Sequence, residues 1–280
     1  MYPDNPHAPA RPREPHVNHQ YSLSVTIITK NEADRIERCL ESVKDLANEI
    51  IVFDSGSTDA TLDIVRRYTD KIWQTDWPGY GLQKQRALEQ AQYDWVLAID
   101  ADEALDEELQ NSLKEFLSRD RQDVVAVKMK WGVTIYEKRL DYGRSARSPL
   151  RMTWREGTFF SNDEVHEKML HASGRTITLK GRLLHFTHRN YGHAQHKSVE
   201  YAWLGSQKYF RKGRRCHSLT GAVLRGLWTF ILIFFIRGGF LDGSIGFLTA
   251  VSYAQNSFNK YAGLWTLTRM EKIETGRAKR

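Results

Sequence analysis

Four short apolar runs alternate with helical patterns in the first 117 residues, and this alternation limits the possible folds more than any other feature. The apolar runs are rich in β-branched and aromatic residues and cover residues 23–29, 49–53, 71–73 and 95–99. The helical patterns cover residues 34–46, 59–68, 81–92 and 107–117. Strands that alternate with helices indicate a mostly parallel sheet that is covered by helices on both faces. We therefore predict an α/β fold.

A polar cluster follows three of these predicted strands. The clusters are Thr29-Lys30-Asn31-Glu32, Asp54-Ser55-Gly56-Ser57-Thr58-Asp59 and Asp100-Ala101-Asp102. Ligands of parallel α/β sheets bind beyond the carboxyl ends of the strands. The three clusters therefore predict a ligand site at one edge of the sheet.

Asp100 and Asp102 are two carboxylates, one residue apart, at the end of an apolar strand. Like charges at this spacing repel each other unless something neutralises them. Mg²⁺ is a common remedy, because it binds through one or two carboxylates together with substrate phosphates. The alternative is a solvated turn before the next helix, since 106–108 has the acidic composition of a first helical turn. The pattern alone fits both interpretations.

Further polar residues near this edge have candidate roles. The Asp54 carboxylate ends a strand and is placed to accept hydrogen bonds from a base or a ribose, whereas Ser57 and Thr58 suit a helix cap. Lys84 is placed to reach a diphosphate, although the solvated face of a helix is an equal alternative. For Arg86 we favour the solvated face.

Composition and charge narrow the class of protein. The chain has 280 residues, a net charge of +7 and two cysteines, which is too few for a disulfide framework and suits a reducing compartment. Residues 1–20 lack an apolar run and are predicted to be a disordered tail. Residues 201–241 contain seven basic residues and no acidic one, and they include the apolar run 227–236.

That run of ten residues is shorter than the roughly 20 residues that span a bilayer. We predict a helix that lies in the membrane interface, with its basic neighbours facing anionic headgroups. A buried core helix with a solvated basic lead-in is the alternative. Nucleic acid ranks last as a partner, because no nucleic-acid-binding module accompanies the charge.

The three clusters, in this order, resemble the signatures of the family 2 glycosyltransferases. Within that family, the lipopolysaccharide-core β-1,4-glucosyltransferases are most similar. The resemblance includes Gly79-x-x-x-Gln83-Lys84, Val165-His166-Glu167-Lys168 and Gly239-Phe240-Leu241-Asp242-Gly243. One departure is Phe53, which stands where the family often has a second acid beside Asp54.

The resemblance implies a Rossmann-like GT-A fold, a UDP-sugar donor, Mg²⁺ or Mn²⁺ as cofactor, and inversion at the anomeric carbon. It implies a nucleoside contact for Asp54, a ribose or metal contact for Asp100, and the principal metal contact for Asp102. Donor contacts also fall to Thr29, Asn31 and Glu32. The predicted organisation is a tail (1–20), a GT-A catalytic domain (21–195) and a helical, amphipathic C-terminal region (196–280).

Inversion needs a carboxylate that takes the proton of the acceptor hydroxyl. The candidates are Glu167, Glu164 and Asp163, and the neighbouring His166 is placed to orient a carboxylate or to bind donor phosphate. His185 is a candidate third metal ligand by resemblance, with a hydrogen-bonded core histidine as the equal alternative. Lys197 is a candidate contact for a phosphate of donor or acceptor.

We therefore expect a cytoplasmic enzyme, peripheral on the inner membrane, that moves glucose from UDP-glucose to the inner-core heptose of a lipid A-linked oligosaccharide. A polyprenyl-phosphate sugar synthase is the rival within the same family. A non-catalytic nucleotide-sugar-binding or membrane-binding protein with the same fold is the rival outside it.

Overall fold

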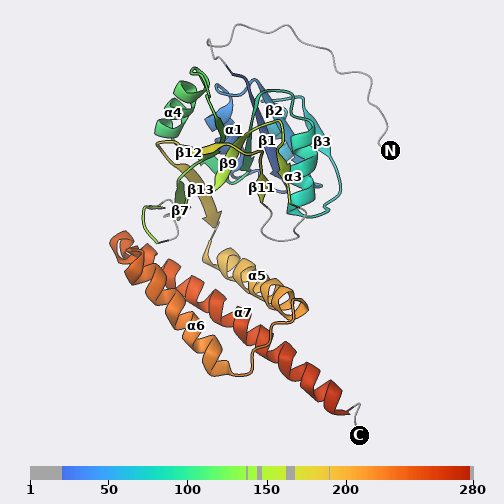
Figure 1. The fold of residues 1–280 in the computed structure, drawn as a ribbon, viewed down its shortest axis with the longest axis vertical. Helices are drawn as coiled ribbons and strands as arrows, with labels where there is room; N and C mark the ends of the chain where they lie inside the picture. Colours follow the sequence, from blue (N-terminus) through green and yellow to red (C-terminus); the bar gives the residue numbers. More distant parts are fainter. Residues whose placement is uncertain (1–20, 137, 144–146, 162–167, 189, 278–280) are drawn as a thin grey trace.

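The computed structural model describes residues 21–136, 138–143, 147–161, 168–188 and 190–277, which form an α/β domain and a set of C-terminal helices (Figure 1). The domain is built on a seven-stranded sheet with the order β12-β6-β9-β4-β1-β2-β3. These strands are β1 (Leu23–Thr29), β2 (Glu49–Asp54), β3 (Ile72–Gln74), β4 (Trp95–Asp100), β6 (Val124–Lys128), β9 (Leu150–Trp154) and β12 (Arg175–Thr178). Strand β1 pairs in parallel with β2 and β4, and β2 pairs in parallel with β3, which confirms the predicted sheet. Strand β9 is antiparallel to both β4 and β6.

The helices of the domain lie where the sequence pattern predicted them; α1 and α2 are shorter at both ends, α3 ends earlier, and α4 has the predicted bounds. They are α1 (Ile36–Val43), α2 (Thr61–Val65), α3 (Tyr80–Glu89) and α4 (Glu107–Leu117). Helix α2 has five residues, because the chain tightens into turns after Val65, where the amides of Arg67 and Tyr68 bond to carbonyls three residues back. Helix α4 begins as predicted: Asp106 caps it by accepting from the amide of Leu109 at 2.9 Å.

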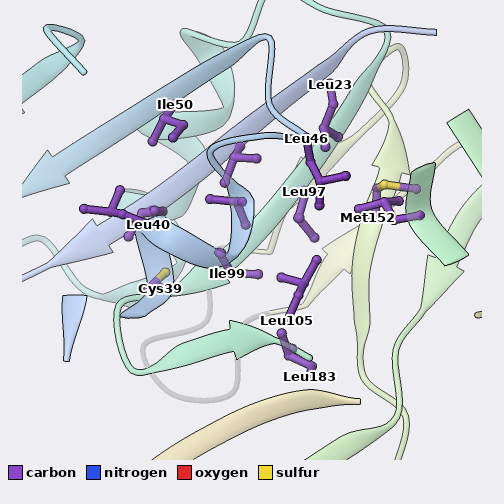
Figure 2. Packing of buried hydrophobic residues seen from close by; sticks show 14 of the residues in the cluster. Leu23, Cys39, Leu40, Leu46, Ile50, Leu97, Ile99, Leu105, Met152 and Leu183 are labelled. Atoms are coloured by element: carbon purple, nitrogen blue, oxygen red, sulfur yellow. The ribbon is translucent and has the colours of Figure 1, made fainter. Parts of the chain in front are cut away.

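Both faces of the central strands are covered, and β1, β2 and β4 are buried along almost their whole length. On one face, Leu23 of β1 and Leu97 of β4 pack in a cluster with Leu40 of α1 (Figure 2). On the other face, Ile28 of β1 packs in a second cluster with Ala87 of α3. This core holds the carboxyl ends of β1, β2 and β4 in fixed register beside one another.

A second, four-stranded sheet with the order β5-β13-β7-β8 stands beside the first. Its strands are β5 (Glu103–Leu105), β7 (Trp131–Ile135), β8 (Lys138–Leu140) and β13 (Leu183–His188). Only residues 101–102 separate β4 of the large sheet from β5 of the small one. The Asp102 region is therefore the point at which the two sheets join. A short hairpin of β10 (Phe159–Phe160) and β11 (Met169–Leu170) completes the described strands.

The C-terminal helices form a layer beneath the domain, in the orange to red colours of Figure 1. They are α5 (Tyr191–Arg211), α6 (Leu219–Ile231), one π-helical turn η1 (Leu232–Ile236), one 3₁₀ turn η2 (Gly239–Asp242) and α7 (Gly243–Arg277). Helix α7 packs against both α5 and α6. A Cβ on Gly226 of α6 would lie 3.2 Å from a carbonyl oxygen of α7, which is a tight contact, so the two helices approach each other closely at this glycine.

The predicted ten-residue apolar helix is in fact longer and mostly uncovered. Helix α6 continues through η1, so that Leu219–Ile236 forms one helical segment of 18 residues. Its mean hydropathy is 2.0, and 17% of its residues are buried. By length and composition this one described helix is able to cross a membrane, although a single such helix is weak evidence. Side chains such as Leu224 and Trp228 are more than half exposed. The helix is therefore much more exposed than the buried core helix that the sequence allowed as an alternative.

Asp242 connects the helices to the small sheet. Its carboxylate accepts hydrogen bonds from the amides of Asp141 and Tyr142 at 3.1 and 3.2 Å, and Lys138 donates to its carbonyl at 2.7 Å. The amide of Gly143 also donates to the carbonyl of Arg237 at 2.9 Å. The end of the apolar helix is thus attached to the sheet that carries β13.

Candidate functional site

The predicted polar clusters meet at one edge of the large sheet. The register places Thr29 opposite Asp54 on β2, and Ile28 opposite Asp100 on β4. The carboxyl ends of the three strands are therefore adjacent, as their parallel pairing requires. Helix α3 supplies Lys84 to this edge, and β9 supplies Arg151.

Asp100 lies between two cations. Its Oδ1 is 2.8 Å from Nζ of Lys84, and its Oδ2 is 3.1 Å from a guanidinium nitrogen of Arg151. Burial alone would raise the pKa of Asp100, but the charges of Lys84 and Arg151 outweigh it and hold the pKa well below its ordinary value. Asp100 is therefore ionised, and both of its oxygens are engaged by protein cations.

Glu103 is a fully buried carboxylate behind the edge, and no role was predicted for it. It accepts from the amide of Asp100 at 3.0 Å, from Nε1 of Trp131 at 3.3 Å and from the Arg151 guanidinium. Arg151 therefore connects two carboxylates, Asp100 and Glu103. Sequence reasoning missed Arg151, because it lies on an antiparallel strand about 50 residues downstream and no local motif marks it.

Asp102 faces a different set of groups. Its Oδ2 lies 3.4 Å from Nε2 of His185 and 3.6 Å from the Arg35 guanidinium. Strand β13 pairs with β5 so that His185 is opposite Glu103, and the His185 ring stacks on Trp131 at 5.5 Å between centroids. The fold therefore brings His185 to Asp102 from a strand 83 residues away in sequence.

The Asp102–His185 pair is electrostatically coupled. Burial would raise the pKa of Asp102, but the attraction and hydrogen bond of His185 lower it below its ordinary value. Burial would likewise lower the pKa of His185, and the charge of Asp102 raises it instead. Arg35 is itself positioned by ion pairing with Glu32 and by donating to the carbonyl of Phe186 at 2.8 Å.

Asp102 and His185 fit two positions on one divalent cation. Two ligands that each lie about 2.1 Å from a metal are about 3 Å apart when adjacent, close to the 3.4 Å between Oδ2 and Nε2. Within the described residues, no three His, Cys, Asp or Glu side chains form a group that could hold a metal. The predicted triad with Asp100 is therefore not assembled, because Lys84 and Arg151 engage Asp100. A site of one carboxylate and one imidazole leaves positions for diphosphate oxygens and water.

Asp54 bonds to the loop that follows β2, and its predicted contact with a nucleoside stays a prediction. The side chain has no exposed surface, and its oxygens accept from the amides of Gly56 and Ser57 at 3.0 and 2.9 Å and from the Ser57 hydroxyl. Asn31, at a φ of 55°, accepts from the amide of Thr58 at 2.8 Å. The structure thus favours a loop-ordering role for Asp54 and Asn31 at this edge.

The remaining predicted donor residues occupy varied positions. Thr29 is buried, and its hydroxyl has no hydrogen-bond partner within the described part of the chain. Glu32 pairs with Arg35. Lys197 lies on α5 with its ammonium 6.0 Å from the ring of Tyr201, whose hydroxyl is 3.2 Å from that of Tyr80 on α3.

The base candidates Asp163, Glu164 and Glu167, together with His166, lie outside the described residues. The hairpin on either side of them is described: the amide of Phe160 donates to Gln85 of α3 at 2.8 Å, and Ser161 bonds to the carbonyl of Lys168 at 2.9 Å. Their predicted roles therefore stay predictions.

Comparisons with known proteins define the class. Residues 24–178 match glycosyl transferase family 2, which covers β1 to β12 and includes Asp54, Asp100 and Asp102. The chain therefore belongs to this family, and the resemblance drawn from the motifs is confirmed.

Individual relatives cover nearly the whole chain. An uncharacterized glycosyltransferase of Rickettsia prowazekii is 30% identical over 88% of this chain and 87% of its own length. The lipopolysaccharide core biosynthesis glycosyltransferase LpsC of Rhizobium meliloti is 31% identical over 84% of this chain and 89% of its own. Among solved structures, S. aureus TarS 1–349 in complex with UDP-GlcNAc matches with a TM-score of 0.46 and 15% identity, over 90% of this chain and 92% of that chain.

Proposed function

We propose that this glycosyltransferase moves glucose from UDP-glucose to the inner-core heptose of a lipid A-linked oligosaccharide. The observation that carries the proposal is the likeness to LpsC, which covers 84% of this chain. The site supports it further, because Asp102 and His185 meet at the ligand edge of the sheet and are able to hold a divalent cation.

Each residue of the site has a defined task in this proposal. Asp102 and His185 would hold Mn²⁺ or Mg²⁺, which neutralises the charge that develops on the departing diphosphate. Arg35 fixes the orientation of Asp102. Lys84 and Arg151 keep Asp100 ionised and add positive charge beside the diphosphate position. The acceptor oxygen bonds to the anomeric carbon, the bond to UDP breaks, and the hydroxyl proton passes to a carboxylate within 163–167.

The C-terminal helices favour an acceptor in a membrane and a helix that lies in its interface. If 219–236 crossed the bilayer, α5 would have to return over the same distance, since it leads from the domain to the start of α6. Helix α5 carries Lys197, Glu200 and Lys208, and charged side chains are costly in hydrocarbon. An in-plane helix avoids this cost and keeps the catalytic domain on the cytoplasmic surface.

The experiment that tests the proposal is a donor screen. The enzyme is incubated with several UDP- and ADP-sugars, extracted core lipid and either Mn²⁺ or Mg²⁺, and the product is identified by mass and linkage. We expect a single hexose on core heptose from UDP-glucose. We also expect faster transfer with Mn²⁺, because imidazole is a poorer ligand for Mg²⁺, which prefers oxygen. A lipid-phosphate-sugar as sole product would establish the polyprenyl-phosphate synthase instead.

Ala substitutions at Asp163, Glu164 and Glu167 test the proposed base. General-base catalysis typically contributes about 10²–10⁴-fold. We expect one variant to lose transfer rate by that factor while its affinity for UDP-glucose, measured by calorimetry, changes little. The other two serve as its controls, since all three remove a carboxylate from the same segment. If all three folded variants transfer at nearly the wild-type rate, the base lies elsewhere.

A further inference from the structure

Arg225 is the one charged residue in the apolar helix 219–236. Its guanidinium carbon lies 4.3 Å from the ring centroid of Tyr261 on α7. The structure thus gives this charge a defined partner, on the helix that packs against α6.

Two further cations gather at the same place. Nζ of Lys260 lies 5.2 Å from the Tyr261 ring and 5.0 Å from the Tyr209 ring, and the Arg214 guanidinium lies 4.7 Å from Tyr209. The two tyrosine rings are 5.9 Å apart. We call these five residues the tyrosine–cation cluster: Tyr209, Arg214, Arg225, Lys260 and Tyr261.

The cluster has positive charge that no carboxylate of the described residues balances. Within the described residues, Arg214, Arg225 and Lys260 form no ion pair, whereas the neighbouring Arg215 pairs with Glu271. Cation–π contacts at exposed sites contribute only about 0.5–1 kcal/mol and do not cancel the repulsion between three like charges. Burial and the neighbouring Tyr209 raise the pKa of Tyr261, so its hydroxyl remains a neutral donor.

Such a set of donors suits a phosphate group. Guanidinium forks, an ammonium and phenolic hydroxyls all donate hydrogen bonds, and phosphate oxygens accept them. Three exposed apolar side chains lie within three residues of Arg225 in the sequence: Leu224, Leu227 and Trp228. A phosphate that is bound here therefore lies at the boundary between a polar and an apolar surface.

We propose that the tyrosine–cation cluster binds the phosphate of an anionic lipid headgroup. The cluster fixes the depth and rotation of the C-terminal helices in the membrane interface. The edge of the sheet that carries Asp100 and Asp102 then faces acceptors in the same leaflet. This inference rests on the membrane association proposed above and adds a specific headgroup site to it.

Binding of the full-length protein to lipid vesicles tests the site. Vesicles of phosphatidylcholine alone are compared with vesicles that also contain about one third phosphatidylglycerol, at one ionic strength, by flotation. We expect Arg225→Gln to weaken binding to the anionic vesicles about 10- to 100-fold, the range for a hydrogen bond to a charged group. The matched variant Lys212→Gln removes an exposed charge outside the cluster, and we expect it to lose about fivefold at most.

A variant that leaves the net charge unchanged distinguishes a specific phosphate site from general electrostatic attraction to an anionic surface. Tyr209→Phe combined with Tyr261→Phe removes two hydroxyls, and we expect several-fold weaker binding to anionic vesicles with unchanged binding to neutral ones. Equal losses for Arg225→Gln and Lys212→Gln, or no effect of the double variant, would overturn the proposal. Release of the protein by millimolar inorganic phosphate at constant ionic strength would make free phosphate the ligand and overturn the lipid assignment. If the wild type binds neither kind of vesicle, the membrane association itself fails.

Discussion

Replacing Asp102 with Asn is expected to reduce the rate of sugar transfer about a thousandfold. The substitution keeps the size of the side chain but removes the negative charge that faces His185 and Arg35. A metal ion at such a site contributes several kcal/mol to the transition state, and each 1.36 kcal/mol corresponds to a factor of ten in rate. If Asp102 holds the cation as proposed, loss of its carboxylate accounts for a loss of this size.

Two measurements check this expectation. Steady-state transfer from UDP-glucose gives the rate, and calorimetric titration of Mn²⁺ in the presence of UDP gives the affinity for the metal, which we expect to fall in parallel. Asp63→Asn is a matched control, because Asp63 is exposed and, within the described part of the chain, pairs only with Arg66 at the end of α2. A transfer rate for Asp102→Asn within threefold of the wild type would remove Asp102 from the catalytic site.

The sequence predicted the N-terminal fold closely, because local pattern decides it. Strand β1 and helix α4 have the predicted bounds, since an apolar run that is buried on both faces and a capped amphipathic helix are both visible in a short window. The length of helix α2 was overestimated, because the chain tightens into turns after Val65 in a way that composition does not reveal. The length of the 18-residue apolar helix was underestimated, because the charge of Arg225 was taken as its boundary. In the structure this charge packs on the ring of Tyr261 from α7, and the helix continues past it.

The site was only partly predictable for a related reason. Asp100 and Asp102 were visible as a local motif, but their different partners were not, since Arg151 and His185 reach them from β9 and β13. Proximity in space from strands that are distant in sequence leaves no periodic signal. The same limit applies to Asp54, whose burial follows from the loop of residues 55–58 that folds back over it.

Replacing Arg151 with Met is expected to destabilise the protein by about 3–5 kcal/mol. Breaking a buried ion pair by removing one partner leaves an uncompensated charge, and that loss has this typical size. Glu103 would be left fully buried, and of its donors among the described residues the Asp100 amide and Trp131 would remain. Asp100 would also lose one of its two cations. We expect the transfer rate to fall as well, because Asp100 and Asp102 are joined by a single residue.

A second substitution distinguishes the unpaired charge from a simple loss of packing. In Arg151→Met combined with Glu103→Gln, no buried charge remains at position 103, and the amide oxygen is still able to accept from Trp131. We expect urea denaturation to show that the double variant regains at least about 1 kcal/mol relative to Arg151→Met, since interacting sites couple by about 0.5–3 kcal/mol. If the two substitutions instead add independently, Arg151 stabilises the edge through contacts other than its pairing with Glu103. Recovery of stability without recovery of transfer would show that Arg151 also acts on Asp100. In the double variant Asp100 keeps its contact with Lys84 but still lacks its contact with Arg151.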